Sequence, residues 1–189
     1  GFGEQAPGVR LELIEATGDA QLAALARGEI DAGVLLHAPG FAPAGLSRLR
    51  LADEALVLAL PQSHALAAAQ PLRLAQALAE PLVMFPRRIL PSLHDALFSL
   101  YHAHGQSPQV AQEAIQMQTI VNLVSAGLGL AWVPDSVRQF QRSGVTYRQL
   151  DAADARVMPR CETSLVWAPS AMTPALGRFV HYLQTWQGV

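Results

Sequence analysis

The chain has 189 residues, of which 51% are hydrophobic and 15% charged, and its formal net charge is -2. This composition is typical of a folded globular protein, and with no basic block it argues against a nucleic-acid-binding surface. The sequence has no apolar run long enough to span a membrane, and its N-terminus lacks the pattern of a signal peptide.

The residue types also exclude several chemistries. All 13 lysine-or-arginine positions are arginine. Without lysine the chain cannot form a Schiff base, anchor pyridoxal phosphate or use a P-loop lysine. Cys161 is the single cysteine, so an intrachain disulfide is impossible and a reducing, cytoplasmic location is expected.

The first third of the chain alternates between predicted helices and strands. Thr17 is a predicted N-cap, and Gly28 predicts the end of the same helix. A strand, a helix and a second strand joined by short loops indicate a parallel pair. The expected elements are a helix tail at 2–6, a strand at 9–16, a helix at 17–28, and strands at 30–36, 46–51 and 55–60.

The remainder repeats this α/β character. Ser92 is a predicted N-cap, with Asp95 completing a capping-box variant. Thr119 also lies at a predicted helix start, and Gly127 supplies the left-handed residue that ends that helix. The expected helices are 72–78, 93–104, 119–127, 136–142 and 174–186; the expected strands are 82–85, 109–115, 130–133, 145–150 and 163–167, with a loop at 151–160.

Four segments then carry a family resemblance. They are LIEATGDAQLAALARGEIDAGVLL at 13–36, EALVLALPQSHALA at 54–67, VNLVSAGLGLAWVPDSV at 121–137 and ALGRFVHYL at 175–183. In this order and spacing, the chain resembles the effector-binding domain of LysR-type transcriptional regulators over nearly its whole length. The Phe85-Pro86-Arg87 turn with Pro91 is further similar to members that respond to aromatic-catabolism intermediates.

The resemblance implies an α/β, two-lobed, periplasmic-binding-protein-like (type 2) fold with an inter-lobe cleft and two crossing strands. Lobe I is expected at 1–61 plus 163–189, and lobe II at 62–162. The N-terminal winged helix-turn-helix domain of the family is absent from this chain. Most of the family's first strand, which contributes to its effector site, is absent as well.

By the same resemblance, a small anionic effector, possibly aromatic, binds between the lobes and modulates DNA binding and transcription by the full-length oligomer. The implied partners are a carboxylate effector, a second copy (a dimer, or a tetramer at full length) and DNA through the missing domain, with no membrane. A solute-binding receptor of a transport system is the alternative on the same fold. An enzyme is not expected, because lysine, a cysteine–histidine nucleophile arrangement and metal-ligand spacing are all missing.

The site hypothesis rests first on helix starts. Free N–H groups and the helix dipole at Thr17, Ser92 and Thr119 favour an anion, although ordinary N-caps explain each residue taken alone. Arg87 is either a bidentate partner for a carboxylate, with Phe85 stacking on a ring, or part of a solvated turn. The positions implied by resemblance, together with the end of the buried strand, add Gly18, Leu36, His37, Pro91, Leu93, Gln118 and Val133. Neither a catalytic residue, a metal site nor a cofactor is expected.

Overall fold

The computed structural model describes residues 1–41, 43–139 and 141–185. Their contacts form two compact units. Unit 1 comprises Gly1–Leu36, Gly40–Ala52 and Glu162–Val189, and unit 2 comprises His37–Pro39 and Asp53–Cys161. The divisions lie within strands β2 (Ser47–Pro61) and β7 (Arg160–Trp167), after Ala52 and Cys161, whereas the sequence suggested boundaries after 61 and 162.

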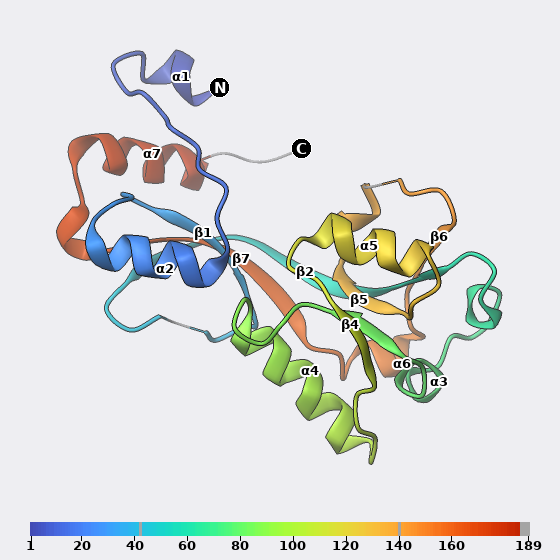
Figure 1. The fold of residues 1–189 in the computed structure, drawn as a ribbon. Helices are drawn as coiled ribbons and strands as arrows, with labels where there is room; N and C mark the ends of the chain where they lie inside the picture. The colour runs from blue at the N-terminus through green and yellow to red at the C-terminus, as the bar shows by residue number, and fades with distance from the viewer. Residues whose placement is uncertain (42, 140, 186–189) are drawn as a thin grey trace. The chain divides into compact units, whose positions relative to one another are not determined.

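Helices and short strands alternate along the chain (Figure 1). The α-helices are α1 (Phe2–Gln5), α2 (Gly18–Arg27), α3 (Leu74–Leu78), α4 (Pro91–Ala103), α5 (Met117–Ser125), α6 (Ala152–Ala155) and α7 (Pro174–Thr185). The strands are β1 (Gly33–His37), β2 (Ser47–Pro61), β3 (Leu82–Met84), β4 (Val110–Glu113), β5 (Ala131–Pro134), β6 (Val145–Arg148) and β7 (Arg160–Trp167). Short 3-10 turns are η1 (Ala65–Ala67), η2 (Asp135–Gln139) and η3 (Pro169–Ala171).

Unit 1 is built on the two faces of β7. Successive strand side chains point to opposite faces, so the buried run of β7 can pack on both sides. Val166 packs with Leu25 of α2 and Leu35 of β1. Leu165 and Trp167 pack instead with the inner face of α7, which includes Leu176, Phe179, Val180 and Leu183. The inward face predicted for the last helix is confirmed; Trp186, its predicted end, lies outside the described residues.

Unit 2 is organised around the buried second half of β2. Leu58 of β2 pairs antiparallel with Trp132 of β5 and with Arg148 of β6. The parallel pair β3–β4 forms a separate two-stranded sheet, and Leu82 of β3 bridges Leu130 next to β5. Helix α5 contacts both β3 and β5. The apolar runs of the sequence are therefore the central strands of this unit.

The predicted helix, glycine stop and buried strand are all present in unit 2. Helix α5 buries Ile120, Val121 and Val124, and Gly127 adopts a left-handed conformation with φ +82° just after the C-cap. All four residues of β5 are buried. The 3.6-residue period and the glycine thus predicted this part of the chain correctly.

The strand predicted at 9–16 is wrong. These residues are without regular structure, and Leu11, Leu13 and Ile14 are 45%, 88% and 64% exposed. The sheets formed by the described residues include no strand from this segment. Alternation gives a segment one apolar face, but a strand also needs a neighbouring backbone for its hydrogen bonds. The predicted strand–helix–strand unit at the start of the chain is therefore incomplete.

Three other element predictions need correction. The two strands expected at 46–51 and 55–60 are one continuous strand, β2, because Asp53 and Glu54 continue the extended backbone between them. The loop expected at 151–160 includes α6, which Asp151 caps by accepting hydrogen bonds from Ala153 N and Asp154 N. The helix expected at 136–142 is the 3-10 turn η2, and Phe140 lies outside the described residues. Within the described residues, no helix has the length and apolar character needed to cross a membrane.

Candidate functional site

The twelve predicted site residues fall into both units. Unit 1 holds Thr17, Gly18 and Leu36. Unit 2 holds His37, Phe85, Arg87, Pro91, Ser92, Leu93, Gln118, Thr119 and Val133. The geometry of the site is therefore described unit by unit.

In unit 1, the predicted start of α2 is confirmed. Thr17 is the N-cap residue, with an extended backbone at φ -68° and ψ 158°. Its hydroxyl donates to the Asp19 carboxylate and does not cap the helix. Leu36 is half-buried in β1.

In unit 2, the predicted capping of α4 is wrong. Leu90 is the N-cap and Pro91 the first helical residue, so Ser92 lies inside the first turn. Proline is favoured at that position because its missing N–H would have no helical acceptor. Ser92 Oγ instead accepts a hydrogen bond from Ala38 N at 3.1 Å. This bond holds the segment that follows the buried His37 against the helix start.

Asp95 does not cap α4 either, because Arg87 occupies its carboxylate. Arg87 Nε and an Nη atom each donate to one Asp95 oxygen at 2.7 Å, a bidentate arrangement. The hydrogen bond from Arg87, assisted by His94, lowers the pKa of the Asp95 carboxyl from 3.8 to about 2. A ligand carboxylate would have to compete with Asp95 for this guanidinium.

Replacing the Arg87 guanidinium should return the pKa of the Asp95 carboxyl towards its ordinary value. In Arg87→Gln, we expect the pKa of Asp95 to rise from about 2 towards 3.8, because the charge-assisted hydrogen bonds are lost. A carboxylate whose pKa is depressed on folding contributes stability above its unfolded pKa, and this contribution is lost as pH falls from 3.8 towards 2. NMR titration of the Asp95 side chain measures the pKa directly. Arg88→Gln, one residue along the same loop, is the control; an equal shift in both variants would contradict the pairing.

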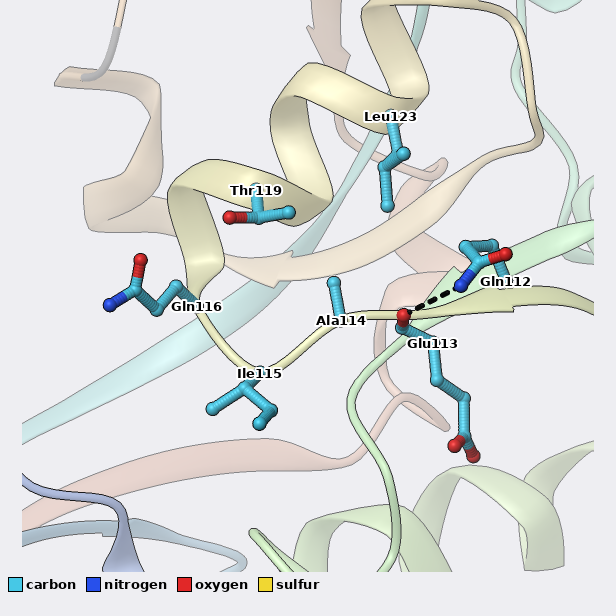
Figure 2. Close-up of a pocket in the computed structure, with 7 residues that line it drawn as sticks. All are labelled: Gln112, Glu113, Ala114, Ile115, Gln116, Thr119 and Leu123. Atoms are coloured by element: carbon cyan, nitrogen blue, oxygen red, sulfur yellow. Dashed lines mark hydrogen bonds between the residues drawn. The ribbon is translucent and has the colours of Figure 1, made fainter.

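A pocket in unit 2 lies between α5 and the segment from β4 to the start of that helix. Its volume is about 580 Å³. Figure 2 shows Thr119 and Leu123 pointing from α5 towards Ala114 on this segment. The described lining residues are Gln112, Glu113, Ala114, Ile115, Gln116, Thr119 and Leu123. The volume lies within the range of small-molecule sites.

The start of α5 provides the hydrogen-bond donors of this pocket. Gln116 is the N-cap and Thr119 the third helical residue, so the prediction that Thr119 begins the helix is wrong by two residues. The first helical hydrogen bond runs from Ile120 N to Gln116 O. The earlier N–H groups of the turn, through Thr119, point out of the helix end, where the dipole favours an anion. Of the described lining residues none is basic and Glu113 is acidic, so recognition of an anion there depends on N–H, amide and hydroxyl groups.

Four of the predicted site residues are buried in unit 2, one of them His37 at 2% exposed. Phe85 is 2% exposed, Leu93 1% and Val133 0%. Their side chains belong to the core under the surface formed by the helix starts. The accessible members of the predicted set in this unit are Arg87, Pro91, Ser92, Gln118 and Thr119.

Sequence reasoning missed most of the residues that line the α5 pocket. Only Thr119 was in the predicted set. The missed residues lie in or just after β4, whose four residues are all exposed, apart from Leu123 on α5. An edge strand with polar residues leading directly into a helix was the available signal, and it would have identified Gln112 and Gln116.

Unit 1 has a second pocket, of about 470 Å³, between α1 and α7. Phe2 anchors α1 there by an edge-to-face contact with Phe179, with ring centroids 5.1 Å apart. Arg178 and His181 also line this pocket. An anion could therefore also meet a positive charge here, which any binding experiment has to distinguish.

The described residues hold no cluster of three metal-ligating side chains. The Cys161 thiol is buried, and burial raises its pKa from 9.0 to about 12, with a further contribution from Glu54. A thiol that keeps its proton at neutral pH is a poor nucleophile. Cys161 donates to Glu54 O at 3.7 Å and is part of the packing of unit 2.

Comparison with known proteins identifies the family of this chain. The model described as the LysR substrate binding domain matches residues 1–188. The chain is 43% identical over 176 residues to the HTH-type transcriptional regulator IlvR of Caulobacter vibrioides, covering 93% of this chain and 57% of that protein. It is 29% identical over 175 residues to the regulator AlsR of Bacillus subtilis, covering 93% and 56%. The chain thus spans less than two thirds of these relatives, and their class does not favour the transport-receptor alternative.

Solved structures show the same fold. The cofactor-binding domain of the Cbl regulator matches with a TM-score of 0.80 at 22% identity, covering 96% of this chain and 77% of that one. The BenM effector-binding domain with its effector benzoate gives 0.73 at 24%, covering 97% and 81%. Full-length CbnR complexed with target DNA gives 0.76 at 24%, covering 97% and 62%. The predicted two-lobed, periplasmic-binding-protein-like fold is confirmed.

Proposed function

Because the chain belongs to the LysR substrate-binding domain family, we propose that it binds a small organic anion as the effector of a transcriptional regulator. The observation that carries this proposal is the family match over residues 1–188. The pocket at the start of α5 supports the anionic class, since its free N–H groups and Thr119 hydroxyl suit a carboxylate. The effector benzoate of BenM, a neighbour in fold, is a carboxylate.

The proposed mechanism is a shift between conformations. An effector can change the protein only by as much as its affinity differs between two states. In the longer protein, that difference is passed to DNA binding as a coupling free energy between the two sites. The proposed contacts are Thr17, Gly18, Leu36, His37, Phe85, Arg87, Pro91, Ser92, Leu93, Gln118, Thr119 and Val133, with the α5 pocket residues added.

The partners follow from the same proposal. The longer protein binds DNA through a domain outside this chain, and it acts in the cytoplasm without catalysis. CbnR was solved at full length on its target DNA, which supports this assembly. The chain pairs with a second copy through the exposed face of α4, where Phe98 meets His102 edge-on. The full-length protein forms a tetramer.

A thermal-melting panel tests effector binding. Aromatic and aliphatic carboxylates, benzoate included, are added to the chain at matched pH. A ligand at one hundred times its dissociation constant should add about 2.7 kcal/mol, which raises Tm by roughly 5–10 °C for a domain of this size. Thr119→Ala should weaken the effective compound about tenfold, because one hydrogen bond to a charged group is lost. Titration calorimetry measures the change.

Two variants act as controls for the position of the site. Thr119→Ser keeps the hydroxyl and should keep the affinity. Arg178→Gln removes a positive charge from the unit 1 pocket and should have no effect. Loss of binding in Arg178→Gln with normal binding in Thr119→Ala would move the site to unit 1, and no response to any acid would contradict the anionic class.

A further inference from the structure

The segment His37–Pro39 is assigned to a different unit from the residues that precede and follow it in the chain. Its contacts place it in unit 2, although the chain before it, through Leu36, and after it, from Gly40, belongs to unit 1. His37 is also the last residue of β1, and it is 2% exposed. Three residues of a loop that begins and ends in one unit are thus held by the other.

A side chain far away in sequence holds this segment. Ala38 N donates to Ser92 Oγ at 3.1 Å, across 54 positions in the chain. On the other side of the same residue, Ala38 O lies 2.8 Å from His37 Nδ1. Both backbone polar groups of Ala38 are therefore satisfied, the N–H group by α4 and the carbonyl by the segment itself.

The Ser92 hydroxyl can serve a second partner at the same time. A serine oxygen accepts hydrogen bonds and also carries one proton to donate. A carboxylate that accepted this proton would make Oγ a stronger acceptor for Ala38 N, since hydrogen bonds in a chain polarise one another. Ligand binding at Ser92 would then tighten the hold on the segment without any new contact to the segment.

We propose that Ser92 is a positioning residue that fastens the His37–Pro39 segment to unit 2 and tightens this fastening when an effector anion binds. The segment is covalently continuous with unit 1 on both sides, so its fastening restricts the movement of one unit relative to the other. The tightening rests on the proposed function, whereas the fastening itself exists without ligand.

Amide hydrogen exchange at Ala38 in the ligand-free chain tests the fastening. Ser92→Ala removes the acceptor, so the Ala38 amide should exchange about fivefold faster, as expected for one hydrogen bond of about 1 kcal/mol. Ser92→Thr keeps the hydroxyl and should restore protection. Ser99→Ala, an exposed serine of the same helix, is the matched control and should leave the rate unchanged. Should Ser92→Ala fail to fold, Ser92→Cys, a weaker acceptor of similar size, should give an intermediate rate.

A distance measurement then tests the restriction. Spin labels on Ala20→Cys in unit 1 and Gln106→Cys in unit 2 report the spread of distances between the units, while the buried Cys161 stays unlabelled. Ser92→Ala should broaden this distribution, and Ser92→Thr should not. Equal Ala38 exchange rates in wild type and Ser92→Ala would overturn the fastening, and equal distributions would overturn its effect on the units. A faster rate together with no binding of any carboxylate would retain the fastening and reject the effector class.

Discussion

Gly129→Ala is expected to destabilise unit 2 by about 3 kcal/mol, the upper part of the range for forcing extra atoms into a packed site. A Cβ at this position would lie 2.5 Å from Pro81 O and 2.9 Å from Pro81 C. These are backbone atoms of the partner segment, held by hydrogen bonds from Leu130 N to Pro81 O at 2.8 Å and from Val83 N to Leu130 O at 2.7 Å. The clash therefore cannot be relieved by turning a side chain. Urea unfolding followed by tryptophan fluorescence measures the loss.

Gly127→Ala is the control variant for Gly129→Ala. Gly127 has φ +82°, and a Cβ there meets no atom within 4 Å. Its substitution should cost only the left-handed backbone penalty, about 1–2 kcal/mol. If Gly129→Ala proved no more destabilising than Gly127→Ala, the close approach of Pro81 to Gly129 would be contradicted.

Leu58→Ala is expected to have an effect of similar size, about 3–4 kcal/mol, through a cavity. Leu58 is 0% exposed and lies where β2 pairs with both β5 and β6. The surrounding strands are tied to one another by backbone hydrogen bonds and cannot collapse into the vacated space. The free energy of unfolding in urea, again followed by tryptophan fluorescence, measures the change.

Leu51→Ala provides the control on the same strand. Leu51 is 38% exposed in the folded chain. Truncating its side chain therefore removes less buried apolar area than truncating Leu58, and it should lower the free energy of unfolding by less than 1 kcal/mol. A similar loss of unfolding free energy in both variants would show that the lower strand propensity of alanine causes the destabilisation, and not a cavity in the core of unit 2. In folded Leu58→Ala protein the effector affinity should stay close to that of the wild type, because Leu58 lies outside the α5 pocket.

Local sequence predicted two helices that each bury one face and one strand that is buried throughout. Helix α5 with Gly127 and β5, and α7 with its inward face, follow from apolar spacing and glycine stops. These patterns are reliable because a helix satisfies its own backbone, so only its apolar face needs a partner. Four quoted segments were also sufficient to identify the family, which the match over residues 1–188 confirms.

Tertiary structure decided where polar groups find partners. Asp95 pairs with Arg87 instead of capping α4, and Ser92 accepts from Ala38 across 54 positions. Ser92 was therefore placed among the site residues for a reason that the structure does not support, since its hydroxyl caps no helix. Short-range capping rules cannot predict such bonds, because the competing donors come from distant parts of the chain.

The sequence by itself thus determined the α/β fold class and most helices, since these depend on apolar periodicity that successive turns repeat, and the order and spacing of four segments carried the resemblance to the family. Only the tertiary structure decided that 9–16 lacks a strand partner, that Gly129 lies against Pro81, and that residues of β4 line the α5 pocket. Each of these depends on contacts between segments far apart in the chain. Strand pairing and pocket lining each need two or more segments. The residue pattern of one segment does not predict which distant segment will lie beside it.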